Sequence, residues 1–90
     1  MSILVVVPTL LRPLTNGEKR VSAQGSSVAE VIDHLEGQFP GIKAKLVHGD
    51  RVHRFVNVYI NEDDIRFADG LDTPVKAGDT LTVLPAVAGG

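Results

Sequence analysis

The residues of this chain that offer the clearest chemistry are the last two, Gly89 and Gly90. Because neither has a β-carbon beside the terminal carboxylate, this end of the chain fits a channel too narrow for any side chain. We therefore expect the Gly90 carboxylate to be the reacting group, within the active site of another protein. A frayed terminus of small residues is the alternative interpretation.

The other polar residues form no recognisable catalytic or metal-binding motif. Absence of cysteine excludes disulfides, thiolate metal sites and a cysteine nucleophile. His34, His48 and His53 lack the spacing of metal ligands on a helix and are interpreted as solvated. No serine or threonine lies in a nucleophile elbow. The sequence thus predicts no catalytic residue and no metal site, which is typical of a substrate or binding partner of enzymes.

Length and composition predict one small soluble domain. The chain has 90 residues, a formal net charge of −2, 43% hydrophobic residues and 22% charged residues. No basic surplus exists to neutralise phosphates, so nucleic acid is not expected as a partner. The N-terminal apolar run, residues 3–7, is too short for a signal sequence or a membrane span, which favours a cytoplasmic protein with no membrane partner.

Charge is unevenly distributed along the chain. Residues 43–54 carry four bases and one acid, or +3, whereas residues 62–79 carry six acids and two bases, or −4. Calcium binding by the acidic stretch is not expected, because Ile65 and Phe67 occupy positions that need oxygen ligands. A solvated acidic face is the plain interpretation, and a docking face for a basic partner is the alternative.

Periodicity predicts the order β-β-α-β-β-β. Residues 3–7 read as a central strand buried on both faces, and Asn16-Gly17 as the turn into an antiparallel strand over 19–23. Ser27 and Glu30 have the spacing of a reciprocal capping box, which starts a helix. The buried stripe of that helix comprises Val28, Val31, Ile32, Leu35 and Phe39, and Pro40-Gly41 ends it. A short helical turn is expected over 42–47, and a loop over 48–50.

The second half of the chain reads as strands joined by turns. Val56, Val58 and Ile60 are expected to face the helix, with Phe55 and Tyr59 facing outward. We expect a brief edge strand at residues 65–67, a tight turn at 77–79 and a last strand at 80–84. The first and last strands then lie side by side at the centre of the sheet.

These expectations define an α+β, β-grasp (ubiquitin-like) fold with a mixed sheet of four to five strands and one main crossing helix. The domain is expected over residues 1–85, followed by a flexible tail over 86–90. Phe55, Tyr59 and Leu84 are a possible apolar docking patch near the start of that tail. Scattered exposed apolar residues, with Phe55 covered by a loop, are the alternative.

A β-grasp domain ending in Gly-Gly after an apolar strand resembles the ubiquitin-like sulfur-carrier proteins of the MoaD/ThiS type. The resemblance covers essentially the whole chain. Three segments look most like the actinobacterial carriers for cysteine synthesis: residues 53–61, the tail over 84–90, and the turn at Arg12-Pro13.

The resemblance implies a defined chemistry and a defined set of partners. An adenylyltransferase/sulfurtransferase of the ubiquitin-activating type adenylates the Gly90 carboxylate and converts it to a thiocarboxylate, while Gly89, Ala88 and Val87 bind in the partner's channel. A cysteine synthase and a zinc-dependent peptidase are the partners implied downstream. ATP, pyridoxal phosphate and zinc belong to those enzymes, so no cofactor is expected to bind this chain stably.

Three alternatives to a cysteine-synthesis carrier stay open on the sequence alone. The first is a carrier for thiamin, molybdopterin or tRNA thiolation. The second is a ubiquitin-like modifier that forms isopeptide bonds through Gly90. The third, from a different class, is a β-grasp interaction module whose glycine tail is incidental.

Overall fold

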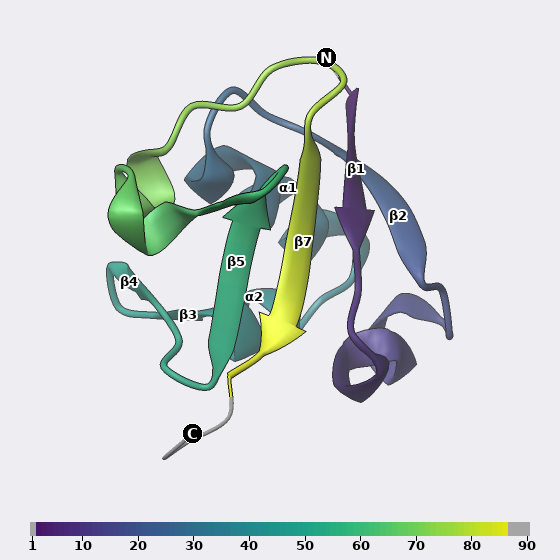
Figure 1. The fold of residues 1–90 in the computed structure, drawn as a ribbon. Coiled ribbons are helices and arrows are strands. Elements are labelled where there is room, and N and C mark those ends of the chain that lie inside the picture. Colours follow the sequence, from purple (N-terminus) through teal and green to yellow (C-terminus); the bar gives the residue numbers. More distant parts are fainter. Residues whose placement is uncertain (1, 87–90) are drawn as a thin grey trace.

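A five-stranded mixed sheet with a long helix packed across one face dominates the computed structural model, which describes residues 2–86 (Figure 1). The elements in chain order are β1 (Ser2–Val6), the 3-10 helix η1 (Thr9–Thr15), β2 (Arg20–Gln24), α1 (Val28–Gln38), α2 (Ile42–Leu46), β3 (Val47–His48), β4 (Arg51–Val52), β5 (Val56–Ile60), β6 (Asp63–Asp64), the 3-10 helices η2 (Ile65–Phe67) and η3 (Gly70–Asp72), and β7 (Thr80–Pro85). The sheet order is β2-β1-β7-β5-β6, and β3 pairs with β4 in a separate ribbon. This architecture confirms the predicted β-grasp fold.

The parallel pairing of β1 with β7 forms the centre of the sheet, as the sequence predicts. Leu4 lies opposite Thr80, and Val6 opposite Thr82. β2 pairs antiparallel with β1 on one side, and β5 pairs antiparallel with β7 on the other. Parallel neighbours need a long crossover connection, and α1 belongs to the segment that supplies it.

The prediction that β1 is buried on both faces is wrong. Ile3 and Val5 are 2% and 1% exposed, but Leu4 between them is 38% exposed and Val6 is only half-buried. The helices cover one face of the sheet and leave the other in contact with solvent (Figure 1). The apolar residues of β1 therefore alternate between the core and the outer face.

Helix α1 begins as predicted at a Ser27 cap, but the capping box is not reciprocal. The Ser27 hydroxyl oxygen accepts from the Glu30 backbone N–H at 3.2 Å. The Glu30 carboxylate accepts instead from the backbone N–H and the hydroxyl of Ser26, at 3.0 and 2.9 Å. These bonds hold the pKa of Glu30 below its ordinary value, the Ser26 backbone N–H having the largest effect.

The hydrophobic core lies between α1 and the sheet. Val28, Val31, Ile32 and Leu35 are fully buried, which confirms the predicted stripe, and Phe39 at its end is half-buried. The alternation in β5 is confirmed as well, with its buried side chains facing this core. Sheet residues that complete the core are Ile3, Val5, Ala23, Val56, Val58, Ile60, Leu81 and Val83.

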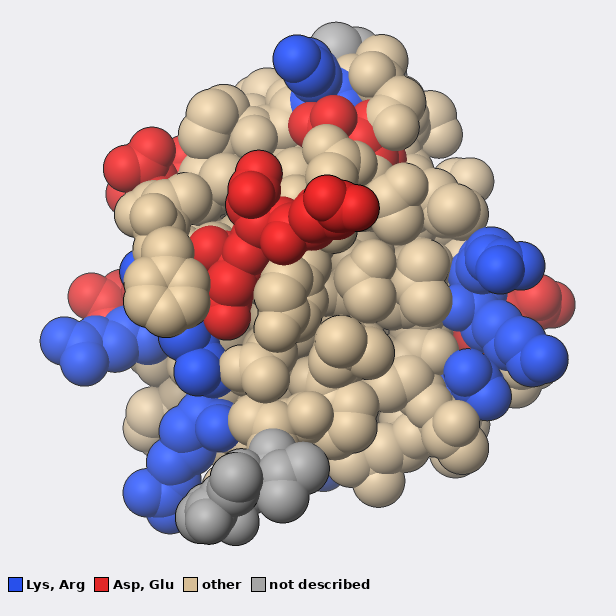
Figure 2. Space-filling view, viewed as in Figure 1, with Lys and Arg blue, Asp and Glu red and all other residues tan. Residues whose placement is uncertain are grey.

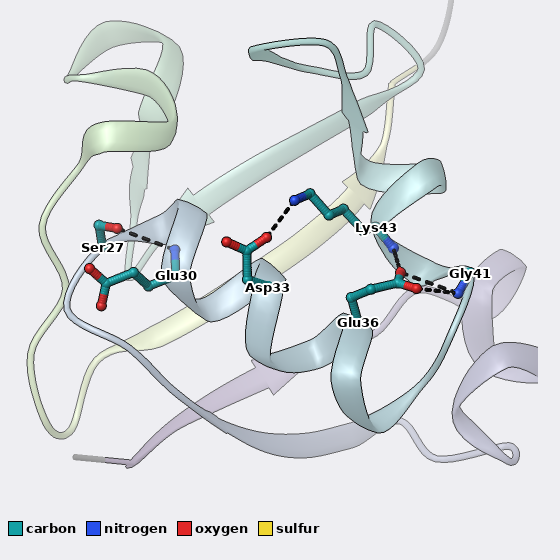
Figure 3. Close-up of polar contacts among 6 residues, drawn as sticks. All are labelled: Ser27, Glu30, Asp33, Glu36, Gly41 and Lys43. Atoms are coloured by element: carbon teal, nitrogen blue, oxygen red, sulfur yellow. Dashed lines mark hydrogen bonds and ion pairs between the residues drawn. The ribbon is translucent and has the colours of Figure 1, made fainter.

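The corner between α1 and α2 is fixed by carboxylates of α1 (Figure 3). Glu36 accepts from the backbone N–H groups of Gly41 and Lys43, at 2.9 and 2.8 Å. Gly41 is the N-cap of α2 and Lys43 lies in its first turn, where backbone donors lack acceptors within the helix. The Lys43 ammonium pairs in turn with Asp33 one turn earlier on α1. The Gly41 and Lys43 bonds lower the pKa of Glu36, Gly41 having the larger effect.

The edge strand expected at residues 65–67 is wrong. The strand that pairs with β5 is β6, and the chain then turns into the 3-10 helix η2, where the Asp64 carboxylate accepts from the Arg66 backbone N–H at 2.9 Å. Ile65 is 1% exposed while Phe67 is 90% exposed. Residues two positions apart on a strand point to the same face of the sheet. Because Ile65 is buried and Phe67 is exposed, this segment is not an extended strand.

A polar network at the start of β7 ties three strands together. Asn61, in the β5–β6 turn at φ 57°, donates to the Asp79 carboxylate at 3.1 Å and accepts from the Thr80 backbone N–H at 3.1 Å. The Lys76 backbone N–H donates to the same carboxylate, and the Asp79 carbonyl accepts from Leu4 of β1. Asn61 chiefly, and Lys76 next, hold the pKa of Asp79 below its ordinary value.

The outer edge of β2 is covered by side chains of α1. His34 accepts through Nδ1 from the Gln24 backbone N–H at 3.1 Å, and the Gln38 amide donates to the Ser22 carbonyl at 3.0 Å. Both backbone groups belong to an edge strand with no further strand beside it. The helix thus supplies the partners that a neighbouring strand would otherwise provide.

Two glycines beside or within α1 are expected to respond in opposite directions to alanine. A Cβ on Gly25 would lie 2.7 Å from the Val31 backbone nitrogen, so Gly25→Ala forces the strand and the helix apart and costs about 1–3 kcal/mol. A Cβ on Gly37 meets nothing within 4 Å, so Gly37→Ala gains up to about 1 kcal/mol of helix propensity. Urea denaturation of the two variants checks both signs, and equal effects would contradict the packing described at Gly25.

Stability is expected to fall in acid through the three carboxylates with lowered pKa, those of Glu30, Glu36 and Asp79. A carboxyl whose pKa is lower in the folded state stabilises the fold at pH values above its unfolded-state pKa. That contribution is lost as the pH falls from about 4.5 through the folded-state pKa values. Urea midpoints between pH 2 and 7 measure the slope, and Glu36→Gln is expected to flatten it. Glu62→Gln is the control, because the Glu62 carboxylate accepts no hydrogen bond among residues 2–86; an equal flattening there would contradict the assignment.

Candidate functional site

The candidate site is the end of the sheet where the chain leaves β7. Pro85 lies opposite Val56 in the ladder, and the Ala86 backbone N–H donates to the Phe55 carbonyl at 2.8 Å. The position from which the tail departs is therefore held beside Phe55. The predicted reacting residue Gly90 and the predicted tail contacts Gly89, Ala88 and Val87 lie outside the described residues.

Two residues of the predicted docking patch, Tyr59 of β5 and Leu84 of β7, lie on the outer sheet face, and Phe55 lies in the turn just before β5. Leu84 lies opposite Asn57, and Asn57 is flanked along the chain by Phe55 and Tyr59 two residues away on either side. Such diagonal neighbours are roughly 7–8 Å apart, within reach of aromatic side chains. Phe55 is 51% exposed and Leu84 44% exposed, so no loop covers Phe55, while Tyr59 is half-buried.

The outer face of the sheet has an uncharged centre (Figure 2). Acidic side chains gather over the β5–β6 turn, basic side chains lie on both flanks, and the area over β7 carries neither. Leu4 of β1, 38% exposed, is a further exposed apolar residue of this face and lies opposite Thr80 of β7. Sequence reasoning missed Leu4, because an uninterrupted apolar run does not distinguish core from surface.

The β3–β4 ribbon, which the sequence does not predict, lines a cleft next to Phe55. Its two-residue turn has Gly49 at φ 67°, which suits the first central position of a tight hairpin turn. The cleft has a volume of about 460 Å³. The residues that line it are His48, Arg51, Val52, His53, Arg54 and Phe55.

The two histidines of this cleft lie beside other rings, and the predicted exposure to solvent holds for His48, while His53 is half-buried. The ring of His53 lies 5.1 Å from that of Phe55 and 6.1 Å from that of His48. Its Nδ1 accepts from the Phe55 backbone N–H at 3.2 Å. His34, the third histidine, lies on α1 at the β2 edge.

Three of the acidic residues line a separate cleft. Glu62, Asp63 and Asp64 line it together with Tyr59 and Phe67. Within residues 2–86, no group of three or more histidine, aspartate or glutamate side chains is arranged to hold a metal ion. Within the same residues, no helix has the length and apolarity to cross a membrane.

Comparison with known proteins places this geometry in a family. Residues 5–90 match the ThiS family. The chain is 47% identical to the sulfur carrier protein CysO of Mycobacterium tuberculosis over the full length of both proteins. It is also 34% identical, over 72% of its length and 71% of the relative's, to the small archaeal modifier protein 3 of Haloferax volcanii.

Solved structures agree with the sequence comparison. CysO of Amycolatopsis orientalis, in a complex with BexX, superposes with a TM-score of 0.92 at 56% identity, over 98% of this chain and 99% of the other. CysO of M. tuberculosis superposes with a TM-score of 0.90 at 45% identity, over 94% and 99% of the two chains.

The chain belongs to the ThiS family of ubiquitin-like carriers. Its full-length similarity to CysO in sequence and structure makes it a sulfur carrier of the CysO type. Proteins of this type are small carriers and not enzymes, which agrees with the prediction from the sequence.

Proposed function

We propose that this protein carries sulfur as a thiocarboxylate on Gly90 and donates it for cysteine biosynthesis. The observation that carries the proposal is the similarity to CysO over the whole chain, which includes the residues up to Gly90. The held position of Ala86 beside Phe55 supports it, because a fixed starting point limits where the tail can reach. The five residues after Pro85 span at most roughly 17 Å when extended.

Loading requires the carboxylate to be activated first. The Gly90 carboxylate attacks the α-phosphorus of ATP and releases pyrophosphate, which gives an acyl-adenylate with a good leaving group. A sulfur nucleophile then attacks the acyl carbon and releases AMP. With hydrosulfide as the nucleophile, the new C–S bond forms as the C–O bond to AMP breaks, so sulfur replaces one carboxylate oxygen, which leaves on the phosphate of AMP.

Use of the sulfur follows from its nucleophilicity. The thiocarboxylate sulfur adds to an electron-poor alkene, such as the aminoacrylate that a pyridoxal-phosphate cysteine synthase forms from an activated serine. Hydrolysis by a zinc-dependent peptidase then releases cysteine and regenerates the carboxylate. We propose that ATP, pyridoxal phosphate and zinc bind these partners, and that the reactions take place in the cytoplasm, where ATP is available.

Partner enzymes must bind both the tail and the domain. Ordering the tail in a channel costs conformational entropy, so the affinity has to come largely from the folded surface. We propose that Phe55, Tyr59 and Leu84 form the apolar part of that surface, while Val87 and Ala88 bury apolar area in the channel and Gly89 and Gly90 admit close approach of the backbone. That CysO of A. orientalis is found in a complex with BexX supports binding through a surface of this kind.

A second candidate function is protein modification through an isopeptide bond at Gly90. The similarity to a small archaeal modifier protein favours it, since that relative shares 34% identity with most of this chain. Both functions start from the same acyl-adenylate, and they differ in whether sulfur or a lysine amine attacks it. Mass analysis of the products therefore separates them.

Incubation with ATP, a sulfide source and an adenylating enzyme that loads known CysO proteins is expected to replace one oxygen of Gly90 by sulfur. Intact-mass spectrometry followed by fragmentation of the C-terminal peptide locates the change. Deletion of Gly89 and Gly90 is the control and should stay unmodified. An unchanged mass, under conditions that convert M. tuberculosis CysO, would disprove the sulfur-carrier chemistry, and higher-mass conjugates that depend on Gly90 would establish the modifier instead.

An uncleaved peptide appended after Gly90 is expected to abolish loading and leave the melting temperature unchanged. The appended residues remove the free carboxylate but add nothing to the core, which is completed by residues up to Val83. Loading is measured by mass and folding by circular dichroism. Full loading of the tagged protein would rule out Gly90 as the reacting residue.

Phe55→Ser is expected to raise the KM for loading about tenfold with little change in kcat, because an aromatic anchor of the docking patch is lost. The matched control is Phe67→Ser, since Phe67 is the more exposed phenylalanine, at 90% against 51%, and lies outside the patch. Steady-state loading rates at varied carrier concentration give both constants. Equal KM values for the two variants would exclude Phe55 from the interface.

A further inference from the structure

The cleft formed by the β3–β4 ribbon and Phe55, here called the ribbon cleft, has no part in the chemistry at Gly90. Its two arginines are exposed, and the Arg54 guanidinium lies 5.0 Å from the centre of the Phe55 ring. Among residues 2–86, no aspartate or glutamate lines the cleft. The ion pair found in that part of the chain joins Lys43 to Asp33, so Arg51 and Arg54 have no carboxylate partner there.

The ribbon cleft lies directly beside the point where the tail begins. Phe55 lines the cleft with its side chain, and its carbonyl accepts the hydrogen bond from Ala86. Figure 1 shows the ribbon beside the start of β5, at the same end of the sheet as the last residues of β7. A protein that takes the tail into a channel must therefore place the rim of that channel near Arg51 and Arg54.

The charge of the ribbon cleft indicates which side chains the rim of the partner's channel should carry. Arginine side chains offer planar pairs of N–H donors that fit carboxylates, and stacking of Arg54 on Phe55 holds one guanidinium in place. The acidic residues Glu62, Asp63 and Asp64 lie around a different cleft, with Tyr59 and Phe67. Arg51 also lines the neighbouring cleft, together with Arg66 and the three aspartates Asp50, Asp69 and Asp72, whereas Arg54 lines only the ribbon cleft. The ribbon cleft itself is thus cationic and aromatic, and the nearest acidic residues lie on the other side of Arg51.

We propose that the ribbon cleft is a docking site for a carboxylate-rich segment at the rim of the partner enzyme's tail channel, with Arg51 and Arg54 as the residues that bind it. This rests on the proposed function, in that the partner is one that receives the tail. Pairing at the rim of an interface mainly accelerates association and orients the two proteins. The pairing thus places the start of the tail at the channel mouth before the tail enters.

The test uses binding to BexX of A. orientalis, measured by titration calorimetry and stopped-flow mixing at low and high salt. Arg51→Glu/Arg54→Glu is expected to weaken binding about tenfold, mainly through the association rate, and to remove most of the salt dependence. The matched control is Lys19→Glu/Arg20→Glu, which makes the same change of charge at the start of β2. We expect its affinity to stay within about twofold of the unchanged protein.

The variants are suited to the question because their folding can be checked independently. Among residues 2–86, the side chains of Arg51 and Arg54 donate no hydrogen bond, so the charge reversal removes none. Melting temperatures show whether the variants stay folded. Equal affinity of the ribbon variant and the β2 control would overturn the proposal, as would the absence of binding by the unchanged protein. Saturation of the cleft by inorganic phosphate below millimolar concentration, seen as NMR shifts of His48 and His53, would also overturn it in favour of a small-anion site.

Failure of this proposal is distinguishable from failure of the proposed function. Deletion of Gly89 and Gly90 abolishes loading but leaves Arg51 and Arg54 in place, so the charge-dependent part of BexX binding is expected to persist in the shortened chain. Loss of loading with retained charge-dependent binding would contradict only the thiocarboxylate chemistry. Normal loading with no effect of the arginine reversal on binding would contradict only the ribbon-cleft proposal.

Discussion

The parallel pairing of β1 with β7 is the constraint on which the rest of the molecule depends. Two strands that run in the same direction cannot be joined by a tight turn, so the chain between them must pass over the sheet, and α1 covers one face on the way. The same pairing brings the last strand to the centre of the sheet. Residues 81–82 of this strand are thus paired on both sides, and its end at Pro85 is held by Val56 of β5.

This arrangement separates stability from reactivity. The core between α1 and the sheet contains the apolar residues, and the Asn61–Asp79 network ties β1 and β7 to the β5–β6 turn. None of these groups is needed for reaction at a carboxylate beyond Ala86. The domain supplies instead a fixed origin for the tail and a surface with distinct apolar, cationic and acidic areas (Figure 2).

The sequence was most informative where burial repeats with a regular period. The stripe of α1 and the alternation in β5 could be predicted because each side chain's face follows from its spacing. The exposure of Leu4 could not be predicted. Leu4 lies in a continuous run of apolar residues, and such a run does not show which side chains face the core and which face solvent. Phe67 was misplaced because alternating large apolar residues resemble a strand, whereas the Asp64 cap starts a 3-10 helix. The ribbon cleft could not be predicted, because the strands that form it pair through only two residues each, which is too short to show a period. The register that places Leu84 opposite Asn57 could not be predicted either, because it joins strands far apart in the sequence.

The covered edge of β2 has a consequence for contacts between copies of this chain. An uncovered edge strand recruits strands from other chains, and identical copies at high concentration are the nearest source. With His34 and Gln38 already bonded to Gln24 and Ser22, that edge offers neither backbone group to an incoming strand. Two side chains of a helix thus occupy backbone groups of this edge that an added strand would need.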